Sequence, residues 1–349
     1  MLQSELTICT VAYKSRMHLD LNWMLSDKLN SAAKAKWVVV ENTEHNPEEQ
    51  VDFDDDRFTV MAGVTTQKIG AYGSYNHAAG LNKTPREVTT LYALFMDPDF
   101  FIIRPEWIRD VLAYMQARGL SFFGAPYYPD RYYKYRYFPS LICLFVDFER
   151  VPKSKLNFSP EINELEAAHK LSWGTLLHWA LVGHRPNPNA AVAGLTSEMA
   201  RYALWARVLA ILLGDRVAAV TSVGGSRDTG YRIYRDFSND RAYLYESLNP
   251  SWNNPLYAHD SSLRTKLKRW FLPDSMSIHP KKWEYSTAWT FRDFGLPDMQ
   301  SQGCEEYFWR GEPFGFHLRG VSTGLRQVDN SLLRESILKF MSHQTVNKE

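Results

Sequence analysis

Two aspartates flank a proline directly after a strand-like run with no polar face. The run at residues 89–96 reads Thr-Thr-Leu-Tyr-Ala-Leu-Phe-Met, and Asp97-Pro98-Asp99 follows it at once. Ligands of open α/β sheets bind outside the carboxyl ends of the strands. Two carboxylates two positions apart can both reach one divalent cation. Asp97 and Asp99 are therefore candidate ligands for Mg²⁺ or Mn²⁺, and the alternative interpretation is an ordinary acidic turn.

Three further segments precede this acidic pair in a fixed order. Residues 6–14 read Leu-Thr-Ile-Cys-Thr-Val-Ala-Tyr-Lys, residues 38–42 read Val-Val-Val-Glu-Asn, and residues 73–82 read Gly-Ser-Tyr-Asn-His-Ala-Ala-Gly-Leu-Asn. Together with Asp97-Pro-Asp99, this series resembles the nucleotide-binding half of the inverting glycosyltransferases of family 2, which have the GT-A fold, particularly their bacterial rhamnosyltransferase-like members. The resemblance covers residues 4–127.

The resemblance implies roles for individual residues. In the family, the turn after the first strand lies against the nucleobase, and an aspartate at the end of the second strand contacts base or ribose. This chain has Glu41 at that second position, which keeps the carboxylate but lengthens the side chain. The acidic pair would hold the metal and the sugar diphosphate. The implied donor-binding residues are Ala12, Tyr13, Glu41, Asn76 and Asp97.

Transfer of a sugar to a hydroxyl group also needs a general base on the face opposite the leaving group. In the family this base is an Asp or Glu of the second half, and the best match here is Asp228 in Arg227-Asp-Thr-Gly-Tyr-Arg232. Arg232 or Arg235 would then pair with phosphate. The alternative is that Asp228 caps a turn or helix that begins near Thr229.

A late histidine is a further candidate ligand. His317 lies in Gly315-Phe-His-Leu-Arg-Gly320, where the flanking glycines let the backbone approach a ligand closely. Some GT-A enzymes complete the metal shell with a C-terminal histidine, so the resemblance implies that His317 binds the metal. A structural role for this histidine is the competing interpretation. Arg319 is a candidate for neutralising the diphosphate.

The elements that must position these residues alternate along the chain. Strands are predicted at residues 6–12, 36–41, 58–62, 89–96, 120–125 and 141–148, with helices after Ser15, over residues 75–82 and from Arg104-Pro105 onward. Strands separated by helices predict an α/β fold with a mostly parallel, Rossmann-type sheet flanked by helices. We expect a mixed α+β second half that shares one continuous sheet with the first. Helices are also expected at residues 161–181 and 197–213.

Domain organisation follows from the same pattern. We expect a donor-binding half at residues 1–127, an acceptor-binding half with the base at 128–341, and a flexible tail at 342–349. The Tyr-rich, basic segment at 127–138 is a candidate sugar-stacking platform or a lid that closes on the donor. The basic segment at 263–272 is either a peripheral membrane contact or a solvated helix face.

Composition excludes several classes of protein. The 349 residues carry a formal charge of +1, which argues against nucleic acid as a partner. The cysteines, Cys9, Cys143 and Cys304, are far apart and fit no zinc or disulfide framework. The stretch 203–220 is interrupted by charges and predicts a buried helix. We therefore expect a cytoplasmic protein, with contact to the inner face of the membrane as an option.

The resemblance implies metal-dependent, inverting transfer of a hexose or deoxyhexose from a nucleoside diphosphate sugar to a glycan or lipid-linked glycan, in the synthesis of bacterial surface polysaccharide. Two alternatives stay open. One is a catalytically degenerate module that binds a glycan or a partner. The other is a nucleotidyltransferase, although such an enzyme would favour a glycine-rich loop after the first strand, and residues 12–16 contain no glycine.

Overall fold

The computed structural model describes residues 5–43, 47–64, 73–128, 138–160, 229–238, 240–251, 290–318 and 330–346. The helices expected at 161–181 and 197–213, the stretch 203–220 and the basic segment 263–272 lie outside these residues. All six strands expected between residues 6 and 148 are present, and several are shorter than predicted.

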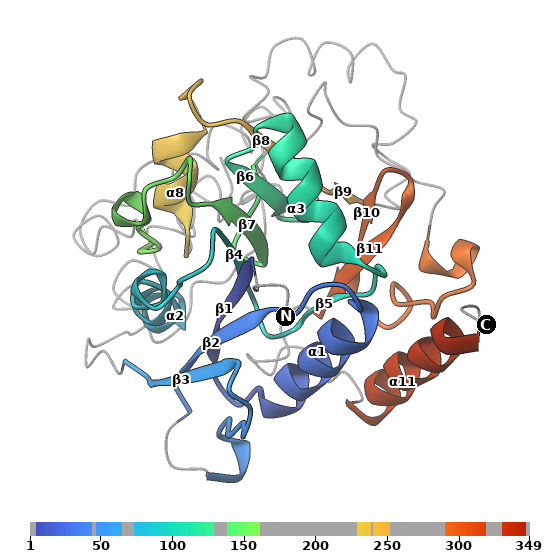
Figure 1. Cartoon of the computed structure of the whole chain (residues 1–349). Coiled ribbons are helices and arrows are strands. Elements are labelled where there is room, and N and C mark those ends of the chain that lie inside the picture. Colours follow the sequence, from blue (N-terminus) through green and yellow to red (C-terminus); the bar gives the residue numbers. More distant parts are fainter. Residues whose placement is uncertain are drawn as a thin grey trace, which may run out of the picture.

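A seven-stranded sheet forms the centre of the molecule (Figure 1). Its order is β3-β2-β1-β4-β7-β6-β8. The pairs β1/β2, β2/β3, β1/β4 and β6/β8 are parallel, whereas β7 runs antiparallel to β4 and to β6. The prediction of a mostly parallel α/β sheet is therefore confirmed. The strands are β1 (Leu6–Ala12), β2 (Lys36–Glu41), β3 (Phe58–Ala62), β4 (Tyr92–Met96), β6 (Phe122–Ala125), β7 (Cys143–Asp147) and β8 (Tyr245–Ser247).

A second, antiparallel sheet of four strands has the order β5-β11-β10-β9. It combines β5 (Phe100–Ile102) from the first half with β9 (Asn249–Pro250), β10 (Glu305–Trp309) and β11 (Glu312–His317) from the second. The two halves thus share the large sheet, to which the second half contributes β7 and β8, but they also form this separate antiparallel sheet, which was not expected. The chain leaves the first sheet at the end of β4 and enters the second at β5 within three residues, so the two sheets meet at Asp97-Pro98-Asp99.

Helices cover the sheets on several sides (Figure 1). Alternating strand residues pack α2 and α8 against one face of the large sheet, and α3 and the second sheet against the other. The far side of the second sheet packs against α1 and α11. The helices are α1 (Arg16–Leu29), α2 (Gly73–Leu81), α3 (Trp107–Arg118), α8 (Tyr231–Phe237) and α11 (Asn330–Val346), with short 3-10 turns at Pro47–Glu49, Thr84–Arg86, Lys153–Lys155 and Phe291–Phe294.

Ser15 does not cap α1 through its side chain, although it occupies the N-cap position. Its hydroxyl instead accepts the Tyr13 N–H at 3.1 Å. The backbone between them turns through Lys14, which has a positive φ of 52°. The serine thus stabilises the turn after β1 and not the first turn of the helix.

Buried aromatic rings account for much of the aromatic surplus. Trp37, Trp107 and Tyr307 are at most 2% exposed, and so are twelve phenylalanines. The three cysteines are also free and buried, each in a different core layer. Most of the described aromatic residues therefore fill the core, as large apolar side chains usually do.

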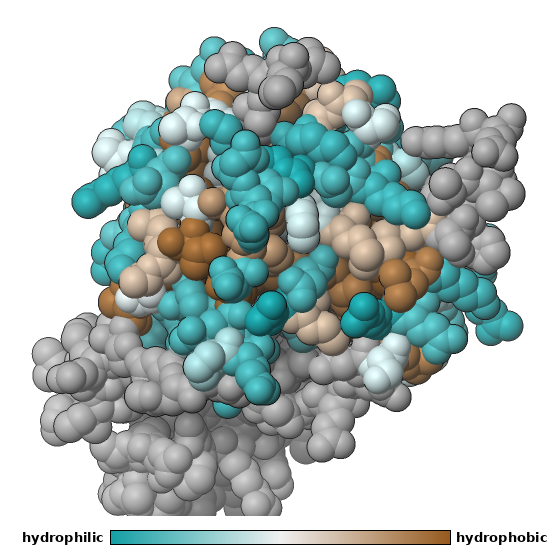
Figure 2. Space-filling view, turned by 60° about the horizontal axis from the view of Figure 1, so that its bottom comes forward, coloured by the Kyte–Doolittle hydropathy of each residue, from teal (hydrophilic) through white to brown (hydrophobic). Residues whose placement is uncertain are grey.

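The surface of the described residues is mostly hydrophilic in the view from below, with separate smaller hydrophobic areas between the polar ones (Figure 2). Among the described helices, none combines the length and the apolar character needed to cross a membrane.

Candidate active site

The acidic motif forms the turn between the two sheets. All five residues of β4 are buried, and the Phe100 N–H closes the turn by donating to the Asp97 carbonyl at 3.1 Å. Proline suits the second position of such a turn because its φ is already fixed. The Pro98 carbonyl accepts a hydrogen bond from Asn22 of α1 at 2.8 Å, and the Asp99 carbonyl accepts one from the Leu318 N–H at 2.9 Å. Other elements therefore hold this turn from both sides.

His317 completes a cluster with the two aspartates. Antiparallel pairing of β5 and β11 places His317 opposite Phe100, and its Nε2 lies 3.3 Å from Asp99 and 4.0 Å from Asp97. One ligand atom from each of these three residues lies within 4.8 Å of the others. Two carboxylate oxygens and one imidazole nitrogen form a donor set that fits a divalent cation.

Glu305 fixes the orientation of the histidine ring. Its Oε2 lies 3.0 Å from His317 Nδ1, and the Tyr307 hydroxyl donates to the same oxygen at 3.4 Å. Glu305 faces His317 across the β10/β11 pair and is only 6% exposed. A carboxylate bound to the far nitrogen of a ligand histidine is a frequent feature of metal sites, so this contact leaves Nε2 directed at the acidic turn.

The acidic surroundings strongly favour the imidazolium form of His317. Burial alone lowers the pKa of this imidazole, but the carboxylates of Asp99 and Glu305 outweigh it and raise the pKa to about 10. The cluster therefore holds one positive charge among three carboxylates when no other cation neutralises them. Excess negative charge of this kind attracts a divalent cation.

His77 is a neighbour of the cluster that sequence reasoning missed. It lies on α2, directly after Asn76, and its Nε2 is 3.5 Å from Asp97 Oδ1. Glu305 and Asn22 were missed as well. The position of His77 inside the Gly73-to-Asn82 motif was the one available signal, since helix residues of that motif face the acidic turn.

The turn after β1 lies at the same carboxyl edge of the sheet. Ala12 is fully buried, whereas Tyr13 is 50% exposed. The Lys14 N–H donates to the Thr43 hydroxyl at 2.9 Å, and the Asn42 N–H donates to the Ala12 carbonyl at 2.8 Å. The turns after β1 and β2 are thus bonded together, with the Tyr13 ring on the outside.

Glu41 shapes the loop that follows β2. Its two carboxylate oxygens accept the backbone N–H groups of Thr43 at 2.6 Å and Val51 at 2.7 Å. Its neighbour Asn42 donates to the Asn76 carbonyl at 3.3 Å and accepts the Val64 N–H at 3.0 Å. These bonds bring Glu41 and Asn76 to one edge of the sheet.

The segment that follows the predicted base docks on α2. The Thr229 hydroxyl donates to the Ser74 carbonyl at 2.9 Å, and the Gly230 N–H donates to the Phe158 carbonyl at 2.8 Å. Asp228 itself lies outside the described residues, as does Arg319.

The two candidate arginines of α8 differ in their surroundings. Arg232 lies in the first turn of α8, and its Nε is buried without a hydrogen-bond partner among the described residues. Arg235 pairs with Asp236 at 2.7 Å. No contact within the described ranges brings either arginine to the acidic turn, so their phosphate contacts remain predictions.

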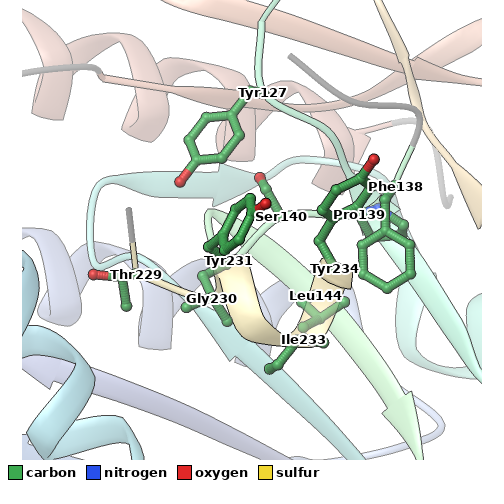
Figure 3. Close-up of a pocket in the computed structure, with 11 residues that line it drawn as sticks. Tyr127, Phe138, Pro139, Ser140, Leu144, Thr229, Gly230, Tyr231, Ile233 and Tyr234 are labelled. Carbon is green, nitrogen blue, oxygen red and sulfur yellow. The ribbon is translucent and has the colours of Figure 1, made fainter. Parts of the chain in front are cut away.

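A small pocket of about 30 Å³ lies between α8 and the chain that precedes β7. In Figure 3, Tyr231 and Tyr234 extend from α8 toward Phe138, Pro139 and Ser140. Tyr127 also lines the pocket, so the first and last members of the Tyr-rich segment both reach it. Residues 129–137 lie outside the described residues.

Comparison with known proteins gives matches to solved structures alone. No protein-family model matches the chain, and no curated protein is similar enough in sequence to be matched. The mannosyltransferase PcManGT from Pyrobaculum calidifontis, in complex with GDP-Man and Mn²⁺, is 10% identical, with 64% of this chain and 80% of that chain covered and a TM-score of 0.35.

TarS from S. aureus, residues 1–349, is 10% identical over 76% of this chain and 77% of that chain, with a TM-score of 0.31. Its complex with UDP is 13% identical over 76% and 78%, with a TM-score of 0.33. Likenesses with TM-scores below 0.5 establish no shared activity, and the function proposed below rests on the site itself.

Proposed function

We propose that this chain is a metal-dependent inverting glycosyltransferase of the GT-A type that uses a nucleoside diphosphate sugar. The observation that carries the proposal is the Asp97/Asp99/His317 cluster, which lies at the carboxyl edge of a mostly parallel sheet beside the turns after β1 and β2. Ligands bind at this edge in α/β folds. The exposed ring of Tyr13 next to it suits stacking on a nucleobase.

The chain's own residues would divide the work of transfer. Ala12, Tyr13 and the loop shaped by Glu41 would hold base and ribose, with Asn76 and Asp97 beside them. A cation held by Asp97, Asp99 and His317 would neutralise the leaving diphosphate. The mixed nitrogen and oxygen donor set favours Mn²⁺ over Mg²⁺. Arg232 and Arg319 would contact the phosphates.

Asp228 would accept the proton of the acceptor hydroxyl. The oxygen then attacks the anomeric carbon on the face opposite the diphosphate, the bond from that carbon to the diphosphate breaks, and the configuration inverts. We assign residues 1–127 to donor binding and 128–341 to the acceptor, a glycan or lipid-linked glycan. The helix α11 continues through Val346, into the segment 342–349 that was expected to be a tail. Synthesis of bacterial surface polysaccharide is the proposed role.

The first test is donor binding. Thermal unfolding of the protein with a panel of UDP-, GDP- and dTDP-sugars and Mn²⁺ should reveal at least one donor that stabilises it, and EDTA should abolish most of that effect. Asp99→Asn should remove the Mn²⁺-dependent part. Glu312→Gln is the matched control, because Glu312 lies on the same strand as His317 but is 67% exposed. Failure of every donor to stabilise the protein, with or without metal, would refute the proposal.

The second test separates transfer from binding. Asp228→Asn should bind the donor as tightly as the unmodified protein and lose transfer by about 10²- to 10⁴-fold, the usual contribution of a general base. The rate of transfer is measured as the release of nucleoside diphosphate when the donor and each member of a panel of acceptor sugars are supplied together. Undiminished turnover would remove Asp228 from the mechanism. A separate assay with a nucleoside triphosphate and a sugar 1-phosphate tests the alternative, because release of pyrophosphate from the triphosphate would identify a nucleotidyltransferase. Donor binding without any turnover would favour the degenerate binding module.

A further inference from the structure

A groove of about 580 Å³ lies along the edge of the large sheet at β8. Its walls come from the last residue of α3, the chain around β8, and the end of β10 with the turn that follows it. The volume falls in the range of pockets that bind small molecules. The polar and charged residues that line it include Arg118, Asp240, Arg241, Glu246, Ser247 and Arg310.

The three arginines of this groove form no ion pairs in the described part of the chain, whereas its two carboxylates accept hydrogen bonds. Arg118, Arg241 and Arg310 are all exposed, and none has a carboxylate within ion-pair distance in the described ranges. In contrast, both oxygens of Glu246 accept the Tyr114 hydroxyl, at 2.7 and 2.9 Å, and Asp240 accepts the Ala242 N–H at 2.9 Å. With three arginines against two carboxylates, the groove carries a net excess of one positive charge.

Arg310 is held in position before any ligand arrives. Its guanidinium lies 4.4 Å from the ring centroid of Tyr114 and 4.9 Å from that of Trp309. Arg310 lies in the turn between β10 and β11, where its backbone has a positive φ of 54°. A planar guanidinium stacked on two rings loses little freedom on binding, and its paired N–H groups match the oxygens of a phosphate or carboxylate.

Two hydroxyl groups of the lining are also unused. The oxygens of Ser238 and Ser247 are buried and have no hydrogen-bond partner in the described part of the chain, although both residues line the groove. Buried polar groups in proteins are nearly always hydrogen-bonded. These hydroxyls are consistent with a polar partner supplied from outside the chain.

The groove is separate from the acidic cluster. Glu305 contacts His317 at one end of β10, and Trp309 and Arg310 line the groove at the other. Four residue steps along a strand correspond to roughly 13 Å. In Figure 1, β8 and β9 lie at the top of the view and β5 lies well below them.

We propose that this groove is a second ligand site, which binds a small polar molecule that carries a phosphate or carboxylate group and is about the size of a sugar phosphate or sugar acid. The arginines would pair with the oxyanion, and the serine hydroxyls would bind the polar body. The proposal does not depend on sugar transfer at the acidic cluster.

Isothermal titration with three probes that share one ring tests this site. The probes are glucose 6-phosphate, glucuronate and glucose, added to the full chain in EDTA so that no metal-dependent site contributes. We expect the phosphate, the carboxylate or both to bind, and glucose to bind at least about tenfold more weakly. The stronger of the two charged probes identifies the oxyanion. Equal binding of glucose, or no binding of either charged probe, would overturn the proposal.

Charge removal localises the binding. Arg118→Gln/Arg241→Gln should weaken binding of the charged probe at least about tenfold, since each hydrogen bond to a charged group is worth about 1.5–3 kcal/mol. Arg109→Gln is the matched control, because Arg109 is an exposed arginine of the same helix that pairs with Asp110. Unchanged affinity in the folded double variant, or an equal loss in the control, would place the ligand elsewhere and overturn the proposal.

Discussion

The contact between Glu305 and His317 determines which imidazole nitrogen faces the acidic turn. Because Nδ1 is bound to Glu305 at 3.0 Å, Nε2 is the nitrogen directed at Asp97 and Asp99. Glu305 touches neither aspartate in any described contact, so it acts through the histidine. It is a positioning residue, and removing its charge should loosen the histidine and reduce its basicity as a ligand.

We expect Glu305→Gln to weaken Mn²⁺ binding by about tenfold or more, which is the usual effect of losing such a partner. Titration calorimetry with Mn²⁺ measures it directly. The control is Glu306→Gln, one residue further along β10 and on its opposite face, where the carboxylate accepts the Phe291 N–H at 3.2 Å. Equal loss in both variants would show a general effect on the strand and contradict the positioning role.

At the scale of elements, α2 can lie close to the large sheet because Gly80 has no side chain. A Cβ at this position would lie 2.8 Å from one methyl group of Val11 on β1 and 3.2 Å from a methyl group of Val40 on β2. This close packing keeps Asn76 and His77 of the same helix next to the ends of β2 and β4.

Gly80→Ala should therefore destabilise the protein by up to about 2 kcal/mol. Overpacking a core costs about 1–3 kcal/mol, and the better helix propensity of alanine returns about 1 kcal/mol. In a Val11→Ala background the Val11 methyl groups are absent and only the Val40 methyl group at 3.2 Å remains, so the same substitution should cost clearly less. Urea unfolding of the four proteins of this cycle measures the coupling, and strictly additive effects would show that the helix does not pack as described.

The elements were predicted from sequence with uneven success, for physical reasons. Six strands of the large sheet and the Asp97/Asp99 pair at the end of β4 follow from apolar runs in the first 148 residues, whereas the three-residue β8 was not predicted. The second sheet was not foreseen. Its strands β5 and β9 have three and two residues, which is too short to show a period. The longer β10 begins with two glutamates and β11 contains a proline and a glycine, which are residue types depleted in strands. Glu305 and His77 could not be identified either, since their roles depend on strand register and helix packing.

At the scale of the whole molecule, stability should depend on pH through Glu306. This side chain is fully buried. Burial, with a smaller contribution from Asp298, raises the pKa of its carboxyl group to about 7. Between about pH 4.5 and pH 7 the unfolded chain loses this proton while the folded chain keeps it. The folded state then binds more protons than the unfolded state, so stability falls as the pH rises through this window.

The unmodified protein should lose on the order of 2 kcal/mol of unfolding free energy through this group between about pH 5 and about pH 7. Glu306→Gln carries no titrating group and should show a correspondingly flatter profile. Urea midpoints of both proteins at several pH values provide the measurement. Parallel profiles for the two proteins would mean that Glu306 ionises equally easily in the folded and unfolded states.

The burial of one free thiol in each core layer gives the molecule a set of internal reporters. Cys143 lies between the two sheets, Cys9 beneath α2 and α8, and Cys304 beside α1 and α11. Burial raises the pKa of the Cys9 thiol to about 12 and that of Cys143 further, so a thiol reagent can attack only after a layer opens. The order in which an alkylating probe modifies these three residues would therefore record which layer separates first, without any engineered label.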